Sequence, residues 1–299
     1  MEYVKNLVSV CVPTYNGEVY LSEALMSIEN QTYNLIEIII SDDNSNDNTF
    51  NIVENFKKSS KFPVKIIKHI PSGIAENWNN CIKNSDGEFI KFLFQDDLLD
   101  STCIEKMIDI LIADSSIGLV SCKRDIISNF EDKSEYVKSW KLNFGNLQSD
   151  LSYDANNNIL LDSSFIKSKY FLSPPINKIG EPSLYFFKKN LVEEIGYFDN
   201  SFKQLLDYEF CCRVLKKYKI LILGECLASF RLHKNQATSF NVNKNDETVL
   251  FKKYLFKKYF LNLSWKDRKI IFLDYFYLGR FLYFFKNKLL NNGNNKTTI

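Results

Sequence analysis

The sequence lacks the signals of several common protein classes. None of its seven cysteines belongs to a C-x-x-C pair, so a zinc site of the usual spacing is not expected. No uncharged apolar run approaches the roughly 18 residues that a transmembrane helix needs. No apolar signal-peptide core precedes the first expected strand either. We therefore expect a cytoplasmic protein whose cysteines are buried free thiols.

A strong charge of either sign is also missing. The 299 residues carry a formal net charge of +2, which is too small to indicate a nucleic acid as partner. The chain contains 45% hydrophobic residues, enough to bury a core, and shows no internal repeat. Composition therefore predicts one large globular domain, with or without an appendage.

Apolar runs alternate with helical patterns along most of the chain. The first expected strands are 7–12, 36–40, 64–68 and 88–94, and the first expected helices are 18–30, 49–58 and 75–83. The pattern weakens over 128–173, where we expect loops and a short helix. Beyond it we expect strands at 184–187, 220–223 and 228–232 and helices at 192–195 and 207–217. The alternation predicts an α/β domain with a largely parallel sheet.

Three polar clusters follow the ends of expected strands. They are Thr14-Tyr15-Asn16, Asp42-Asp43 and Asp96-Asp97. In α/β sheets ligands bind beyond the carboxyl ends of the strands. We therefore expect the three clusters to face one crevice.

Each acidic pair has two interpretations. Asp96 and Asp97 repel each other unless a cation or hydrogen-bond donors offset their charge, and their oxygens suit Mg²⁺ or Mn²⁺. The alternative is a solvated turn before a helix that Asp100 caps. The pair Asp42-Asp43 either belongs to a run of turn and cap residues or accepts a hydrogen bond from a nucleobase or ribose.

Several segments together resemble a known enzyme family. They are residues 8–16 (VSVCVPTYN), residues 38–47 (IIISDDNSND), Asn79 placed eight residues before Gly87, and residues 196–199 (GYFD). In this order they resemble family 2 glycosyltransferases over roughly residues 7–240. The resemblance implies the GT-A fold, a Rossmann-like mixed and mostly parallel sheet flanked by helices. It places a glycosyltransferase domain at 1–240 and a C-terminal helical extension at 241–299.

The resemblance also implies a nucleotide-sugar site. Residues implied to bind the nucleotide sugar are Pro13, Thr14, Tyr15, Asp43, Asn79 and Asp96. Tyr15 would stack on the base, and Asp43 would accept from it, which favours a UDP-sugar. Asp97 would be the main ligand of a divalent metal, Mn²⁺ or Mg²⁺. The chain departs from the family at Phe94, where relatives often carry another Asp.

A second set of implied roles lies nearer the C-terminus. Asp207 falls on the position of the catalytic base, while the acid that usually precedes it is replaced by Leu206. His233 would contact the metal or the diphosphate, with Arg231 countering negative charge beside it. Glu181 either contacts an acceptor hydroxyl or belongs to a tight turn.

Two further polar residues have structural interpretations. Glu209 either supports the acceptor site or pairs with Arg213 four residues on. His69 follows an expected strand, and we expect it to be structural.

The C-terminal segment is rich in aromatic and basic residues. Over 251–290, Asp267 and Asp274 are the acids among many Lys and Arg. Helices of this kind lie on anionic membrane surfaces, or pack their rings on the catalytic domain or on another subunit of an oligomer. Both alternatives remain open at this point.

These observations predict an inverting, metal-dependent hexosyl- or N-acetylhexosaminyltransferase. It would move a sugar to a glycan or lipid-linked acceptor in cell-surface polysaccharide synthesis, on the inner face of the membrane as a peripheral protein. The first alternative is a nucleotidyltransferase, although no glycine-rich basic phosphate loop follows Pro13. The second is a non-catalytic protein that binds nucleotide sugars or acts as a scaffold.

Overall fold

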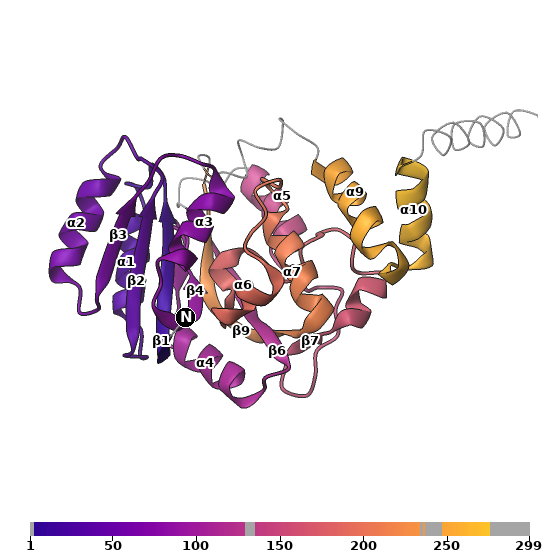
Figure 1. Ribbon diagram of the computed structural model, residues 1–299, viewed down its shortest axis with the longest axis horizontal. Coiled ribbons are helices and arrows are strands. Elements are labelled where there is room, and N and C mark those ends of the chain that lie inside the picture. The colour runs from indigo at the N-terminus through magenta and orange to yellow at the C-terminus, as the bar shows by residue number, and fades with distance from the viewer. Residues whose placement is uncertain (1–2, 129–134, 234–235, 237–246, 276–299) are drawn as a thin grey trace, which may run out of the picture.

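The computed structural model describes residues 3–128, 135–233, 236 and 247–275. Its described part contains a nine-stranded mixed sheet in the order β3-β2-β1-β4-β8-β6-β9-β5, with β7 paired to β9. Helices α9 and α10 lie at the end of the molecule opposite β3 and α2 (Figure 1). The expected mixed, mostly parallel α/β sheet with C-terminal helices is confirmed.

The strands and helices follow the chain in alternation. The strands are β1 Val4–Thr14, β2 Ile36–Asp42, β3 Val64–Lys68, β4 Gly87–Phe92, β5 Leu98–Leu99, β6 Ile117–Ser128, β7 Ile159–Leu161, β8 Phe186–Lys188 and β9 Lys219–Leu232. The α-helices are α1 Leu21–Glu29, α2 Thr49–Ser59, α3 Ile74–Lys83, α4 Cys103–Ala113, α5 Glu135–Phe144, α6 Asn190–Ile195, α7 Leu206–Lys217, α9 Glu247–Tyr259 and α10 Trp265–Tyr275. Short 3₁₀ turns lie at Ser163–Lys167, Pro182–Leu184 and Phe260–Asn262.

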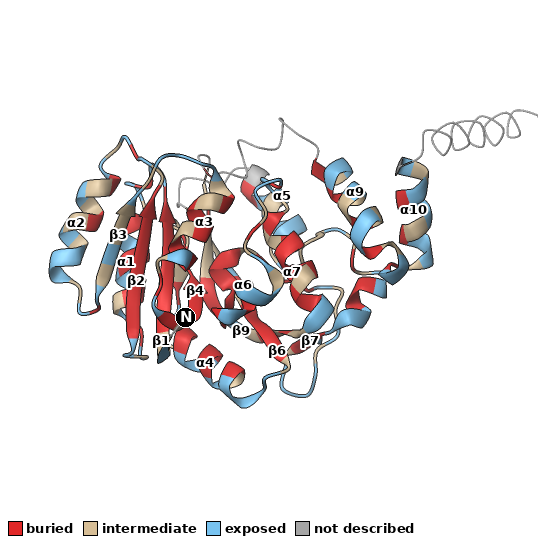
Figure 2. Ribbon diagram, in the orientation of Figure 1, coloured by how far each residue is buried: buried red, intermediate tan, exposed pale blue. Residues whose placement is uncertain are grey.

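The first half of the sheet is parallel. Strand β1 pairs in parallel with β2 and β4, and β2 pairs in parallel with β3. Every residue of β2 is buried, because helices and loops cover both of its faces, as Figure 2 shows in red. The parallel register brings Thr14 at the end of β1 opposite Asp42 at the end of β2.

The second half contains the antiparallel pairs. Strand β8 pairs antiparallel with both β4 and β6, so it joins the parallel half to the β6–β9 pair. The expected strands 220–223 and 228–232 are one strand, β9, whose register against β6 shifts near Gly224. A Cβ at Gly224 would lie 1.8 Å from the carbonyl oxygen of Asn157, which explains the glycine at this irregularity. Strand β6 was not anticipated, and 184–187 is strand only from Phe186 on.

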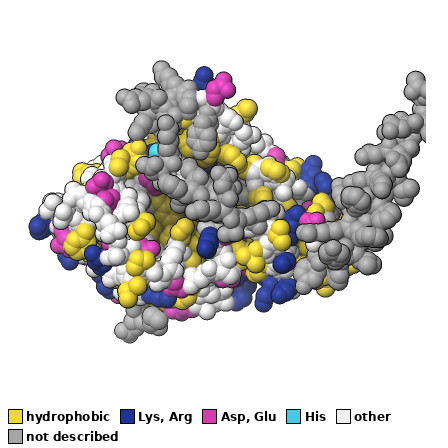
Figure 3. Space-filling view, turned by 90° about the horizontal axis from the view of Figure 1, so that it is seen from above, with side chains coloured by type: hydrophobic (Ala, Val, Ile, Leu, Met, Phe, Trp, Pro, Cys, Tyr) yellow, Lys and Arg dark blue, Asp and Glu magenta, His cyan; other side chains and the backbone are white. Residues whose placement is uncertain are grey.

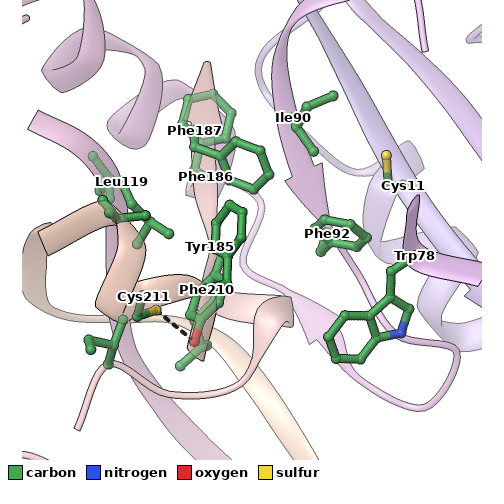
Figure 4. Close-up of a cluster of buried hydrophobic side chains, with 14 of the residues drawn as sticks. Cys11, Trp78, Ile90, Phe92, Leu119, Tyr185, Phe186, Phe187, Phe210 and Cys211 are labelled. Carbon is green, nitrogen blue, oxygen red and sulfur yellow. Dashed lines mark hydrogen bonds between the residues drawn. The ribbon is translucent and has the colours of Figure 1, made fainter. Parts of the chain in front are cut away.

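The core is continuous and aromatic. Phe186, Phe187 and the preceding Tyr185 are fully buried; Tyr185 and Phe187 contact α7 at Cys211 and Phe210, whereas Phe186 stacks on Phe89 of β4. Figure 4 shows these rings beside Phe92, with the Tyr185 hydroxyl bonded to Cys211 at 3.2 Å. Each of the seven cysteines is a free thiol and each is buried except Cys226, so the expectation of buried thiols is wrong at that position.

The C-terminal helices contact the rest of the fold. Phe251 on α9 is buried, and its ring lies 6.1 Å from that of Phe202 and 5.7 Å from that of Tyr208. Helix α9 of the expected extension at 241–299 therefore packs on the rest of the fold, whereas 241–246 and 276–299 lie outside the described residues. Within the described residues no helix is long and apolar enough to cross a membrane.

Candidate active site

The carboxyl ends of β1 and β2 form one wall of the site. Thr14 is buried, and its hydroxyl donates to Asp42 at 3.2 Å. Asp42 also accepts from the backbone N–H and the hydroxyl of Ser45. Asp42 therefore fixes the loop after β2, and Asp43 is left as the carboxylate of this pair that a ligand can reach.

Asp43 lies in a small polar cluster. Its backbone N–H donates to the carbonyl of Thr14 at 2.9 Å, whereas its buried Oδ1 has no hydrogen-bond partner. Burial raises the pKa of Asp43, and the nearby His69 lowers it. Nε2 of His69 lies 3.4 Å from Oδ1 of Asp43 and 3.1 Å from Oδ1 of Asn77. The Asn77 Nδ2 in turn donates to the Thr14 carbonyl. His69 is thus tied to the base-binding wall, which its strand-end position alone did not reveal.

Tyr15 lies at the open side of this wall. It is 52% exposed, whereas the preceding Pro13 is buried. Gln95 bonds the Tyr15 backbone twice, accepting from its N–H at 2.8 Å and donating to its carbonyl at 3.0 Å. A Cβ on Gly17 would lie 2.4 Å from Oε1 of Gln95, so this clasp requires a glycine there. No sequence signal indicated this role for Gln95, which lies next to Phe94, where the chain departs from the family.

Asn79 does not face this wall. Its amide donates to the carbonyl of Phe198 at 2.9 Å and accepts from the Phe198 N–H at 3.0 Å. The side chain is buried and ties α3 to the loop before α7. The implied contact of Asn79 with the nucleotide sugar is therefore corrected to a structural role.

Asp96 and Asp97 have different environments. Asp97 is 1% exposed, and its carboxylate accepts from the hydroxyl of Ser183 at 2.6 Å and from the N–H of Arg231 at 3.0 Å. Burial and then the charges of Asp96 and Glu181 hold the pKa of Asp97 well above its usual range. Each oxygen of Asp97 accepts one hydrogen bond from the protein and the side chain is almost fully buried, so Asp97, the expected metal ligand, is less accessible than Asp96.

Asp96 is the more accessible of the two. Its Oδ2 lies 2.9 Å from Nε2 of His233, and both side chains are partly exposed. The His233 ring also contacts Tyr20, with 5.0 Å between the ring centroids. Two segments far apart in the sequence thus bring a carboxylate and an imidazole together.

Arg231 supports this pair from behind. Its Nε donates to the carbonyl of Asp96 at 2.9 Å, and its Nη2 donates to Glu23 at 2.7 Å. Its guanidinium also lies 4.5 Å from the ring centre of Tyr20. The Arg231 side chain is therefore engaged by the protein, and it positions the Asp96 backbone.

The donor set can be tested for a divalent metal. Among the described residues there is no group of three or more His, Cys, Asp and Glu that could hold one. Mg²⁺ and Mn²⁺, however, are commonly held by one or two protein ligands together with substrate phosphates and water. The partly exposed carboxylate of Asp96 and imidazole of His233 fit such a site, and Asp97 lies more deeply buried beside them.

Asp207 lies at the start of α7. It is half-buried, and its carboxylate accepts from Asn177 Nδ2 at 2.8 Å and from the Tyr208 N–H at 2.7 Å. Burial, together with the charge of Glu181, raises the pKa of Asp207 to about 7, against those two hydrogen bonds. A carboxylate with a pKa near 7 can take a proton at neutral pH. No sequence signal pointed to Asn177, which lies beyond the weakly patterned segment.

Glu181 lies among these acids. Its Oε2 pairs with Arg124 at 3.0 Å, and its buried Oε1 has no hydrogen-bond partner. Burial raises the pKa of Glu181, the Arg124 charge lowers it, and Asp96 raises it. The rings of Trp140 and Phe230 stack with their centroids 5.3 Å apart, and the Arg124 guanidinium lies beside them, 5.7 Å and 5.2 Å from the two ring centres. The expected turn is present, since the Glu181 carbonyl accepts from the Leu184 N–H at 2.9 Å at the start of the 3₁₀ turn Pro182–Leu184, and the free side-chain oxygen leaves an acceptor for a hydroxyl donor.

Glu209 faces away from the acids. It is 1% exposed and pairs with Arg213 at 2.8 Å, as the i,i+4 alternative predicted. It also accepts from the Tyr254 hydroxyl of α9 at 2.5 Å. Glu209 is therefore a support of α7, not an acceptor contact.

Comparison with known proteins agrees with this geometry. The chain is 29% identical to an uncharacterized glycosyltransferase of Rickettsia typhi over 81% of this chain and 69% of that protein. Over 33% of this chain and 32% of the relative, it is 39% identical to the GalNAc(5)-diNAcBac-PP-undecaprenol beta-1,3-glucosyltransferase of Campylobacter jejuni. These relatives carry glycosyltransferase names.

Two solved structures share the fold. The structure of S. aureus TarS 1-349 in complex with UDP-GlcNAc has a TM-score of 0.63 and 20% identity, covering 89% of this chain and 70% of that one. The mannosyltransferase PcManGT from Pyrobaculum calidifontis, in complex with GDP-Man and Mn²⁺, has a TM-score of 0.61 and 18% identity, covering 85% and 65%. Both are GT-A glycosyltransferases. The family model for glycosyl transferase family 2 matches residues 9–170, and the chain belongs to that family.

Proposed function

We propose that this glycosyltransferase moves a hexosyl or N-acetylhexosaminyl group from a UDP-sugar to an acceptor hydroxyl with inversion at the anomeric carbon. The observation that carries the proposal is Asp207, a half-buried carboxylate whose pKa is about 7. It lies near enough to Glu181 for the charge of Glu181 to raise its pKa. The charge of Glu181 likewise raises the pKa of Asp97, the neighbour of Asp96.

The donor's base would bind between Tyr15 and Asp43. The exposed ring of Tyr15 offers a stacking face, and the unpartnered Oδ1 of Asp43 can accept from the N3–H of uracil. The complex of TarS with UDP-GlcNAc supports uridine, while the complex of PcManGT with GDP-Man makes guanosine the competing donor in the test.

The diphosphate would lie beside Asp96 and His233. A divalent metal held there would offset the negative charge of the leaving nucleotide. Arg231 keeps the Asp96 backbone in place, and Asp97 anchors β9 through the Arg231 N–H. We propose Asp96, in place of the expected Asp97, as the carboxylate that faces the metal.

In the transfer step Asp207 accepts the proton of the acceptor hydroxyl. The acceptor oxygen forms its bond to the anomeric carbon as the bond to the nucleotide diphosphate breaks, so the configuration inverts. Asn177 orients the carboxylate through its bond to Oδ2. A second hydroxyl of the acceptor substrate donates a hydrogen bond to the free oxygen of Glu181, which thereby orients the substrate.

The acceptor we propose is a glycan or a lipid-linked glycan of cell-surface polysaccharide synthesis. The Campylobacter relative, whose name includes an undecaprenol-linked acceptor, supports this class. Lys and Arg side chains gather at the end of the molecule where α9 and α10 lie (Figure 3). Trp265 is 80% exposed there. These features support a peripheral contact with an anionic membrane.

A donor screen tests the proposal. The full-length protein is incubated with UDP-, GDP- and dTDP-sugars and lipid-linked or glycan acceptors, with Mn²⁺, Mg²⁺ or EDTA. We expect transfer from a UDP-sugar that EDTA removes and Mn²⁺ restores. Donor binding without turnover would favour the non-catalytic protein that binds nucleotide sugars, and an absence of both binding and turnover with every donor and metal would leave only the scaffold alternative. NMR of the product's anomeric centre decides inversion.

A further inference from the structure

The helix that carries Asp207 begins without a cap of its own. Helix α7 starts at Leu206, and its N-cap residue Leu205 has no side-chain acceptor for the first N–H groups. Such groups need an acceptor when they are shielded from water. In the loop that leads into α7, three consecutive backbone N–H groups, those of Lys203, Gln204 and Leu205, donate to the carboxylate of Glu247 at 2.7, 2.8 and 3.1 Å.

Glu247 comes from a distant part of the chain. It is the first residue of α9, and it is only 8% exposed. A carboxylate at this place satisfies the N–H donors and also complements the positive end of α7. Glu247 therefore supplies, from α9, the acceptor for the N–H groups of the loop just before α7, and in this sense it caps the entry to that helix.

Two more contacts seat α9 on α7. The Tyr254 hydroxyl donates to Glu209 at 2.5 Å, and burial, followed by the charges of its neighbours, raises the Tyr254 pKa. The Tyr254 ring lies 5.6 Å from that of Phe202, in the loop that Glu247 anchors. Glu247, Phe251 and Tyr254 recur at helical spacing, so one face of α9 makes all of these contacts.

Asp207 is the second residue of α7. The orientation of the Asp207 side chain depends on the backbone at the start of α7, because that backbone follows directly from the loop that Glu247 holds. We propose that Glu247 is a positioning residue for Asp207, and that α9 thereby completes the catalytic unit. This inference rests on the proposed function, in which Asp207 is the base.

The test compares full-length Glu247→Gln with Asp267→Asn. Asp267 is a matched control: it is also 8% exposed and also lies in the first turn of its helix, but its carboxylate bonds Ser264 and not α7. We expect Glu247→Gln to lower kcat at least tenfold while donor KM changes less than threefold. Asp267→Asn should leave both parameters within twofold of wild type. An unchanged kcat in Glu247→Gln overturns the inference but leaves the proposed function standing.

A structural measurement separates positioning from unfolding. In hydrogen exchange, we expect the amides of 203–209 to exchange at least tenfold faster in Glu247→Gln, while those of β1 stay unchanged. Unchanged exchange at 203–209 overturns the inference, whatever the activity. If Glu247→Gln does not fold, Tyr254→Phe, which keeps the ring and removes the bond to Glu209, must lower kcat at constant KM, and an unchanged kcat overturns the inference. A wild type without transfer overturns the proposed function and this role together.

Discussion

Gln95 holds the backbone of Tyr15 at both its N–H and its carbonyl, at 2.8 and 3.0 Å. The residue just before the acidic pair thus fixes the backbone of Tyr15. In the proposed function, this one amide would join the part of the site that binds the base to the part that binds the sugar diphosphate. Gln95, which makes this connection, lies next to Phe94, the position where relatives often carry an Asp.

Replacing Gln95 tests this connection. Gln95→Leu removes both bonds, and two hydrogen bonds are worth about 1–3 kcal/mol, so donor KM should rise roughly 5- to 100-fold with little change in kcat. The control is Gln204→Leu, a change at an exposed side chain. Steady-state kinetics with the UDP-sugar gives both values. An equal KM in the two variants would show that the clasp does not shape the donor site.

Asp96 and Asp97 should differ in their response to metal. Asp96→Asn should raise the Mn²⁺ concentration for half-maximal activity by about tenfold or more, as loss of a ligand commonly does. Asp97→Asn should leave that concentration within about threefold, because an amide can still accept from the Arg231 N–H and bond Ser183. Metal titration of initial rates decides. The reverse order would restore Asp97 as the ligand.

Asp207→Asn should lower kcat by roughly 10²- to 10⁴-fold, because the proton acceptor is lost. Donor binding, measured by calorimetry, should stay near that of wild type. In the wild type kcat should fall as pH drops below about 7, since the carboxylate with a pKa of about 7 becomes protonated. Full activity of the variant would remove Asp207 from the mechanism.

The same carboxylate has a consequence for stability. Its folded-state pKa is raised above the unfolded value of about 3.9, so its contribution is fully present below that value and is lost as pH rises through 7. We expect Asp207→Asn to raise Tm relative to wild type at pH 8 and to match it at pH 4. Thermal unfolding at the two pH values checks this sign.

His69 and Asp43 should act as a unit. His69→Ala should raise the KM for the UDP-sugar several-fold, because Asp43 loses the imidazole 3.4 Å from its Oδ1. In an Asp43→Asn background the same change should add little, which a double-mutant cycle measures. Additive effects of the two changes would place His69 outside base recognition.

The membrane contact can be tested without disturbing α9. Removing all residues after 245 would strip Glu247 from α7, so the truncation should end at 275 instead. We expect the 1–275 chain to co-sediment less with anionic liposomes than the full-length chain does, since several basic and aromatic residues follow position 275. Equal co-sedimentation of both, at the level found with neutral liposomes, would exclude the membrane contact.

The alternation of apolar runs and helical patterns predicted the parallel half well. The strand expected at 64–68 is β3, and Asp43 and Tyr15 lie at the expected wall. The motif could not separate Asp96 from Asp97, because their difference comes from the Ser183 hydroxyl of a distant 3₁₀ turn and from the Arg231 N–H of strand β9. The motif likewise did not show that the Asn79 amide bonds the backbone of Phe198.

The C-terminal segment shows another limit of sequence patterns. Its aromatic and basic composition left membrane and packing alternatives open, and the buried rings of α9 support packing for that helix. The cap that Glu247 provides depends on a contact 42–44 residues away in the sequence. No local pattern encodes such a contact.

Arg231 lies near the end of strand β9, and His233 directly follows its last residue. Side chains alternate between the faces of a strand, so one inserted residue between 228 and 231, where the register with β6 is regular, would turn Arg231 away from Asp96 and carry His233 with it. An insertion at the irregularity near Gly224 would be absorbed before the register with β6 resumes. The strand thus has a segment whose length is free to vary and another whose length sets the chemistry.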